Sequence, residues 1–174
     1  MSPPTAHRLH LYRFPAGADF GGHLAGALER MLLIGGGELC DALFVMRGAN
    51  AGEATAIDLR TASAGGTLAT LLDFRLDERR RRAVTDATLR PGADRVRPAD
   101  VEGVAAMLER GGALLAVVTT GGPARALEDA AARTGGRLVA DEPAGADRIA
   151  DLEPGALVSV ARAAERTAPS IHIT

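Results

Sequence analysis

The sequence predicts an α/β domain, because the same order of structural elements occurs twice along the chain. In each copy an apolar run of β-type residues leads through a glycine-marked turn into a helix, and a glycine pair then separates this helix from another strand. The two helices are expected over residues 24–34 and 124–133. Leu28-Glu29 and Leu127-Glu128 lie at nearly the same distance before the two glycine pairs. This repetition favours two similar halves that pack into one sheet.

Five short segments are predicted as strands. They cover residues 9–14, 39–46, 54–59, 113–118 and 137–141. The segment 39–46 is a nearly unbroken apolar run, as expected of a strand that is covered on both faces. The glycine-containing turn that follows it predicts an antiparallel hairpin with residues 54–59.

Four further features predict how the helices begin and end. Asp19 is a plausible N-cap for the first helix. Arg97-Pro98 places a proline in the first turn of a helix that runs to about residue 108. Residues 68–84 are expected to form a helix whose C-terminal arginines suit the negative end of its dipole. A short Ala-rich helix is expected near residues 156–166.

Together these elements predict one folded domain with two flanking segments. Residues 1–7 are expected to be a disordered lead-in, residues 8–142 a single α/β domain, and residues 143–174 a C-terminal tail that contains the short helix. The predicted order is β-α-β-β, a helical link, and then α-β-α-β. This order predicts a ferredoxin-like, pseudo-duplicated single sheet with helices, of the α+β type.

Several segments, taken in order, resemble a family of small bacterial proteins with no assigned function. The segments are Leu11-Tyr12-Arg13-Phe14-Pro15, Asp41-Ala42-Leu43-Phe44-Val45, Arg97-Pro98-Ala99-Asp100-Val101, the strand 111–118 and Gly135-Gly136-Arg137-Leu138-Val139. The pattern is similar to domain-of-unknown-function family 6325 and to its relative, family 1269. The resemblance spans about residues 8–142 and implies no catalytic residues.

The composition argues against several classes of function. The chain has 174 residues, of which 47% are hydrophobic and only 3% aromatic, and its formal net charge is −2. A nucleic-acid surface needs positive charge and aromatic faces for stacking, so no nucleic-acid partner is expected. The absence of lysine excludes Schiff-base chemistry through a lysine amine. Cys40 is the single cysteine, and no window reaches the ~20 apolar residues that a membrane span needs, so a cytoplasmic protein without a span is expected.

Two strand-to-helix turns are the candidate anion sites. One contains Gly17 and Asp19, and the other contains Thr120, Gly121 and Gly122. Backbone N–H groups at a helix N-terminus can hold an anion. Neither turn has the glycine spacing of a phosphate-binding loop, so ordinary turn geometry is the alternative explanation.

A basic run and an apolar tip are the candidate partner-binding segments. The basic run is Arg79, Arg80, Arg81 and Arg82, for which a solvated helix end is the alternative. The tip is Ile171-His172-Ile173, which can add a short strand to a neighbouring sheet. The four histidines lack a metal-ligand spacing with any carboxylate or cysteine, so no metal and no cofactor are expected.

These observations favour a non-enzymatic protein that acts through protein–protein contact, as a homo-oligomer or with another protein through its C-terminal tail. The alternative is a sensor for a small anionic metabolite, with a cleft between the turns at Gly17 and Gly121. An enzyme of unrecognised type is the third possibility, since no nucleophile and base occur in a known motif.

Overall fold

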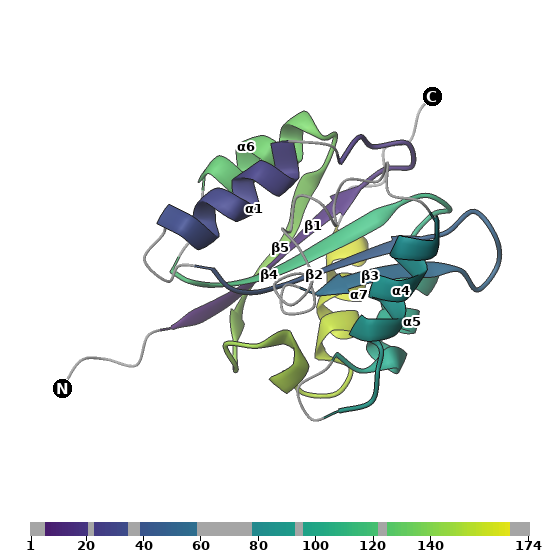
Figure 1. Ribbon diagram of the computed structural model, residues 1–174. Helices are drawn as coiled ribbons and strands as arrows, with labels where there is room; N and C mark the ends of the chain where they lie inside the picture. Colours follow the sequence, from purple (N-terminus) through teal and green to yellow (C-terminus); the bar gives the residue numbers. More distant parts are fainter. Residues whose placement is uncertain are drawn as a thin grey trace.

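The computed structural model shows an antiparallel sheet with helices on both of its faces (Figure 1). The residues it describes are 6–20, 23–34, 39–58, 78–92, 96–121 and 125–167. The strands are β1 (His7–Phe14), β2 (Leu39–Arg47), β3 (Ala54–Asp58), β4 (Ala113–Thr120) and β5 (Arg137–Ala144). Their spatial order is β3-β2-β4-β1-β5, and each neighbouring pair is antiparallel. Strand β1 therefore lies between β4 and β5.

The connections between strands produce the ferredoxin-like arrangement. Helix α1 (His23–Ile34) joins β1 to β2, and helix α6 (Arg125–Arg133) joins β4 to β5. In each unit the two joined strands are separated by one antiparallel strand, which is a split β-α-β unit. Leu28 of α1 and Leu127 of α6 are both buried in the same core. The duplication in the sequence thus corresponds to two equivalent units, and β3 adds a fifth strand beside β2.

The helices form two layers, one on each side of the sheet. Helices α1 and α6 pack against each other on one face, above the sheet in the view of Figure 1. Helix α5 (Pro98–Met107), helix α7 (Ala156–Thr167) and the 3₁₀ turn η1 (Ile149–Asp151) cover the other face. Helix α4 (Glu78–Thr88) packs beside the edge strand β3. Both faces of the central strands are therefore buried.

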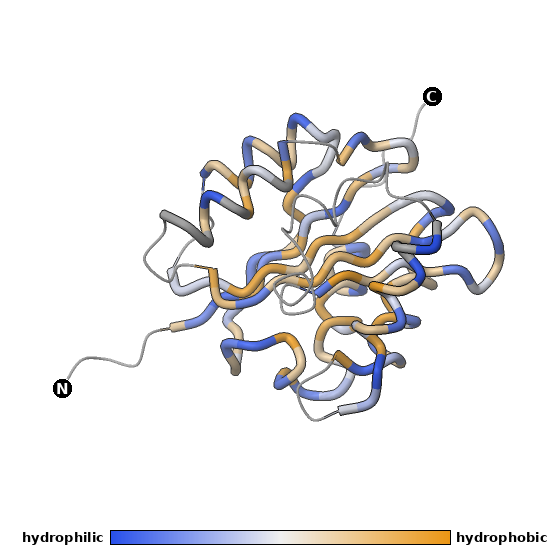
Figure 2. The backbone as a smooth tube through the Cα atoms, viewed as in Figure 1, coloured by the Kyte–Doolittle hydropathy of each residue, from blue (hydrophilic) through white to orange (hydrophobic). Residues whose placement is uncertain are grey.

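Each face of the sheet has its own hydrophobic core. The core under α1 and α6 contains Phe14, Phe20 and Phe44, whose rings meet edge to face with centroids 5.2 and 5.0 Å apart. The buried residues of the core under α5 and α7 are aliphatic. Hydrophobic residues line the central strands between these two layers, as Figure 2 shows in orange. The Phe and Tyr residues that the structure describes are thus gathered on one side of the sheet.

The end of α6 shows why a glycine pair follows this helix. Gly135 has a φ of +85°. Its N–H donates to the carbonyl of Ala132, and the N–H of Gly136 donates to the carbonyl of Ala131. These two bonds are those of a Schellman motif, which needs the left-handed conformation that glycine adopts without strain. A Cβ atom at Gly136 would also overlap the Phe14 ring. The pair therefore ends the helix and lets β5 approach the core.

The structure differs from the sequence-based expectation for the helical link. Residues 59–77 lie outside the described residues, and α4 covers Glu78–Thr88. The arginine run at residues 79–82 therefore lies in the first half of α4 and not at its C-terminal end. The interaction of a charged side chain with the helix dipole is worth only about 0.3–1 kcal/mol. We therefore infer that packing against β3 decides where α4 lies.

The C-terminal segment also differs from the expected tail. β5 continues through Ala144, and α7 follows where a short helix is expected. Leu157 and Ala161 of α7 are buried at 2% and 3% exposure against β5 and α5. The segment is thus part of the folded domain as far as Thr167.

Among the helices that the structure describes, none is both long and apolar enough to cross a membrane.

Candidate functional site

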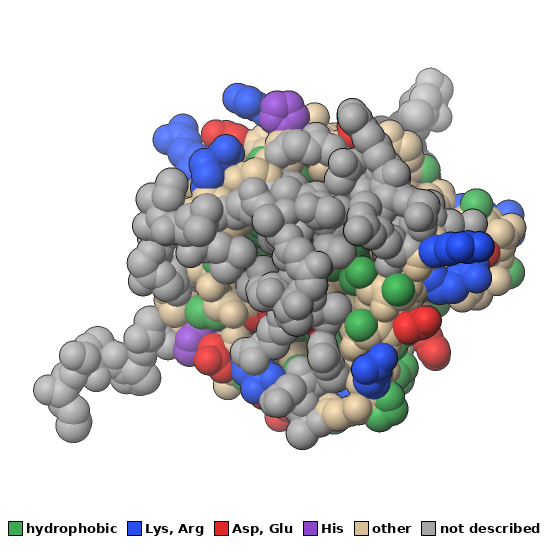
Figure 3. All heavy atoms as spheres, viewed as in Figure 1, with side chains coloured by type: hydrophobic (Ala, Val, Ile, Leu, Met, Phe, Trp, Pro, Cys, Tyr) green, Lys and Arg blue, Asp and Glu red, His purple; other side chains and the backbone are tan. Residues whose placement is uncertain are grey.

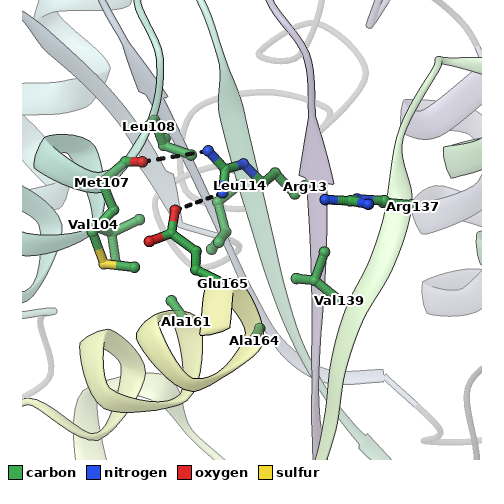
Figure 4. Close-up of a pocket in the computed structure, with 10 residues that line it drawn as sticks. All are labelled: Arg13, Val104, Met107, Leu108, Leu114, Arg137, Val139, Ala161, Ala164 and Glu165. Carbon is green, nitrogen blue, oxygen red and sulfur yellow. Dashed lines mark hydrogen bonds and ion pairs between the residues drawn. The ribbon is translucent and has the colours of Figure 1, made fainter. Parts of the chain in front are cut away.

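A narrow slot opens between helices α5 and α7 and the sheet (Figure 4). Its helical walls come from Val104, Met107, Ala161 and Ala164, and its floor comes from Leu114 and Val139. Ala161 and Ala164 are three residues apart on α7, so they share one face of the helix, and their short side chains leave room above the sheet. Inside its mouth the slot has room for little more than one water molecule.

Charged side chains stand at the mouth of this slot. Arg13 Nη1 on β1 donates to Glu165 Oε1 on α7 at 2.6 Å, and Arg13 Nη2 donates to the carbonyl of Met107 at 3.4 Å. Arg137 lies directly opposite Arg13 in the β1–β5 register. Within the described part of the chain, the Arg137 guanidinium forms no hydrogen bond or ion pair. The mouth therefore holds two guanidinium groups and a single carboxylate, which leaves a net positive charge.

A second group of polar residues is buried across three strands on the opposite face. His10 Nε2 of β1 lies 2.9 Å from Thr119 Oγ1 of β4, and Thr119 Oγ1 donates to the carbonyl of Gly121 at 3.2 Å. Whether Nε2 donates to this hydroxyl or accepts from it depends on which ring nitrogen carries the proton. Asp141 of β5 lies on the other side of the ring, with Oδ1 3.3 Å from His10 Nδ1. The three side chains connect β4, β1 and β5.

The electrostatics of this buried group are unusual for a sheet interior. His10 Nδ1 and Tyr12 Oη are buried without a hydrogen-bond partner among the described residues. Burial lowers the pKa of His10 below its ordinary value of 6.5, the Asp141 carboxylate opposes this shift, and Arg8 adds to it. Burial also raises the pKa of the Tyr12 hydroxyl, with further contributions from Glu128 and Asp141. The environment thus favours a neutral imidazole and a neutral phenol.

The order Thr119, His10 and Asp141 is that of a nucleophile, a base and an orienting acid. However, His10 is only 0% and Thr119 only 1% exposed to solvent. Asp141 Oδ1 also accepts a hydrogen bond from Arg8 Nε at 2.7 Å. A substrate cannot reach the threonine hydroxyl through the described structure. We therefore interpret this group as a structural link between strands.

The two turns chosen as anion sites do not meet in the structure. Phe14 pairs with Ala113 and His7 with Thr120 in the β1–β4 register, so the turn after β1 and the turn after β4 lie at opposite ends of the sheet. Gly17 and Gly121 both have a positive φ, +78° and +105°, which glycine adopts readily. Asp19 is exposed and precedes the first described turn of α1. Thr120 is half-buried, and Gly122 lies outside the described residues. A shared cleft between the two turns is therefore ruled out by the register.

The candidate partner-binding segments are only partly described. Arg79 and Arg82 are exposed on α4, and the side chains of Arg80 and Arg81 lie outside the described set. Arg82 borders an open hollow between α4 and the β2–β3 loop. The tip Ile171-His172-Ile173 lies beyond Thr167 and is likewise outside the described residues. Its proposed role in docking stays a prediction.

The surface over α1 and α6 carries charges of both signs. His23, Arg30, Asp129 and Arg133 border a shallow hollow between these helices. Figure 3 shows basic and acidic side chains close together in this region, at the top of the view. Such mixed charge gives no continuous basic surface for a polyanion. Nowhere in the described ranges do three His, Cys, Asp or Glu side chains group as a metal site would require.

The sequence does not point to the residues of the slot or of the buried polar group. Arg13 and Arg137 look like ordinary strand arginines, and Glu165 lies in a segment expected to be a tail. Asp141 is 131 residues from His10, so no local spacing signals their contact. The one usable signal is that both arginines occupy strands of the predicted sheet.

Comparisons with protein-family models, with curated proteins and with solved structures gave no match to this chain. The resemblance to family 6325 therefore stays a prediction.

Proposed function

We propose that this protein is a non-enzymatic module that assembles with a second copy of itself through the outer edge of β5. The observation that carries the proposal is the difference between the two edges of the sheet. At the β3 edge, the N–H of Ala56 donates to Thr85 Oγ1 at 3.2 Å and that of Asp58 to Thr88 Oγ1 at 3.4 Å, so α4 covers this edge. β5 pairs only with β1 among the described strands. An uncovered edge is a template for pairing with another chain.

The side chains of β5 favour a second copy of the same strand as the partner. Arg137 lies opposite Arg13 and Glu142 opposite Leu9, and Arg13 and Leu9 share one face of β1. Arg137 and Glu142 therefore lie on the same face, near opposite ends of β5. In an antiparallel pair of β5 strands related by a two-fold axis, Arg137 of each copy approaches Glu142 of the other. Opposite charges across paired strands stabilise the pairing by about 0.2–1 kcal/mol each.

An apolar residue on the other face of β5 supports the same surface. Leu138, at 38% exposure, is the large hydrophobic side chain that the described structure leaves exposed. Pairing of two β5 strands would bury part of it. Pro143 lacks an N–H group, so it limits the pairing to the earlier part of β5.

Light scattering on the full chain tests this proposal. We expect a mass of twice the 17.9 kDa of one chain. Because the two-fold axis repeats each contact, Arg137→Glu alone places two pairs of negative charges together, and Glu142→Arg alone places two pairs of positive charges together. Each single variant should therefore raise the dissociation constant of the dimer about tenfold. The double variant Arg137→Glu/Glu142→Arg restores the opposite charges and should recover the parent affinity.

The control is Arg125→Glu, which reverses an exposed arginine on α6 and should leave the dimer unchanged. A parent protein that stays monomeric at the highest accessible concentration would exclude the proposal. The proposal would also be excluded if the double variant lost as much dimer affinity as the two single variants lose together.

A further inference from the structure

We propose that the opposed arginines Arg13 and Arg137 select the strand that pairs with β5, because they favour only a strand that brings a carboxylate beside Arg137. This selection rests on the self-assembly through β5 proposed above, and it fixes the register of that assembly. The slot behind the two arginines has room for little more than one water molecule, so their charges face solvent and not a ligand cavity. Their counterion therefore comes from the surface, where β5 meets its partner.

In the single chain the two arginines form an unfavourable pair. Arg13 and Arg137 lie directly opposite each other in the β1–β5 register, where like charges destabilise a sheet. The carboxylate at this place is Glu165, which Arg13 already binds at 2.6 Å, and Arg13 also donates to the carbonyl of Met107 at 3.4 Å (Figure 4). Arg137 is exposed, and within the described ranges its guanidinium has neither a hydrogen bond nor an ion pair. Strand β5 thus begins with a positive charge that the described fold leaves unbalanced.

Glu142 of a second copy is the carboxylate that can balance this charge. Strand β5 contains two carboxylates, Asp141 and Glu142. Asp141 pairs with His10, so it lies on the other face of the sheet from Arg137, and it already accepts a hydrogen bond from Arg8 at 2.7 Å. Glu142 is exposed and shares the face of Arg137. A two-fold pair of β5 strands therefore balances both copies of Arg137 when each lies opposite Glu142 of the other copy.

A slipped register loses this contact. A slip of one residue turns the side chains of the incoming strand to the opposite faces. A slip of two residues places Ala140 or Ala144 of the other copy opposite Arg137, and neither side chain carries a charge. The repulsion between Arg13 and Arg137 then stays unbalanced, as it does against any strand with an apolar or basic residue at this position. The arginine pair thus disfavours other registers and other strands, and such penalties against wrong partners produce specificity.

A double-mutant cycle in urea unfolding tests the repulsion within one chain, at low concentrations where light scattering gives the mass of a single chain. Arg137→Gln removes the like charge and should lower the equilibrium constant of unfolding by up to about fivefold. In a chain that carries Arg13→Gln, this gain should disappear, because Glu165 is then available to Arg137. An equal gain in both backgrounds would overturn the proposal.

The matched control for this cycle is Arg133→Gln, which replaces an exposed arginine at the end of α6. Its effect on unfolding should be the same with and without Arg13→Gln. A dependence as large as that of Arg137→Gln would show that the coupling is a general effect of net charge, and this result would also overturn the proposal.

A second cycle tests the selection between chains. Glu142→Arg is expected to raise the dissociation constant of the dimer about tenfold when Arg137 is present. In a chain that carries Arg137→Gln, the same substitution should raise it by less than about threefold, because the charge that recognises Glu142 is gone.

Failure of the selection and failure of self-assembly give different results. A parent dimer that responds equally to Glu142→Arg with and without Arg137→Gln retains self-assembly and overturns the selection by the arginines. A parent protein that stays a single chain at the highest accessible concentration overturns both.

Discussion

His10 shows how one polar residue can join three strands of a hydrophobic sheet. Its ring is fully buried, with Thr119 on one side and Asp141 on the other. Either neutral tautomer keeps a polar contact between the ring and Thr119. A second proton would strengthen the attraction to the Asp141 carboxylate, but it would place a charge in the core. Burial is the larger of the two effects, because the pKa of His10 is lowered.

This balance predicts how stability depends on pH. The folded protein holds the His10 proton more weakly than the unfolded chain, whose histidine pKa is about 6.5. The contribution of His10 to the free energy of unfolding is therefore fully present above about pH 6.5 and is lost as the pH falls through that value. Urea unfolding between about pH 8 and pH 5 measures this slope. His10→Gln places an amide that does not titrate beside Thr119 and should flatten the slope.

The control for this measurement is His23→Gln, which removes an exposed imidazole on α1. It should retain the parent pH profile. If His10→Gln and the parent lose stability in parallel below pH 6.5, the slope comes from other groups.

Single-residue roles were the least predictable from the sequence, for a physical reason. Arg13 and Arg137 occupy strands that were predicted, yet their approach depends on the β1–β5 register, which a bulge shifts between Leu11 and Tyr12. Side-chain period alone cannot place such a bulge. The approach of Asp141 to His10 likewise joins residues that are 131 positions apart in the sequence.

Among the helices, α4 acts mainly as a cover for an edge strand. Its threonines at 85 and 88 accept hydrogen bonds from the N–H groups of Ala56 and Asp58. Those N–H groups are on the outer side of β3 and would otherwise be available to another chain. Hydroxyls on a helix thus take the place of a sixth strand.

The substitution Thr85→Val tests this cover. Valine has nearly the same shape but cannot accept the Ala56 N–H, so a buried donor loses its partner. The expected loss is about 1–3 kcal/mol in the free energy of unfolding, measured by denaturant titration. Thr167→Val removes an exposed hydroxyl at the end of α7 and should change stability by less than about 0.5 kcal/mol. Similar losses from both variants would show that the effect is not specific to the edge.

The sequence predicted the type of each element better than it predicted which elements pack against each other. The proline of Arg97-Pro98 and the glycine pair at 135–136 identified the start of α5 and the end of α6, because these residues restrict or extend the backbone locally. The place of α4 depended on tertiary contact with β3. The dipole argument used for its arginines was too small to decide where the helix lies.

At the scale of the whole molecule, α7 completes the second core. The sheet face beneath it carries Leu9, Leu11 and Val118, which are buried at 3% exposure or less. The predicted boundary at residue 142 would leave this face uncovered. The internal duplication predicted the sheet, but α7 lies outside the duplicated units, so the duplication gave no reason to include it in the domain.

Two truncations test this view of the domain. A chain that ends at Glu142 should lose cooperative thermal unfolding, because it exposes an aliphatic face that α7 buries. A chain that ends at Thr167 retains α7 and should unfold with nearly the parent enthalpy in calorimetry. Full cooperativity in the shorter chain would show that residues 143–167 are dispensable for folding.

The central position of β1 has a consequence for how the chain reaches this structure. Residues 7–14 precede the other described strands of the sheet along the chain, yet their neighbours are residues 113–120 and 137–144. The β2–β3 hairpin can close locally, while β1 must wait until most of the polypeptide has left the ribosome. Long-range pairing of this kind requires the closure of large loops and slows folding. Strand β1 is thus made before both of its partners, yet it can enter the sheet only after they have been made.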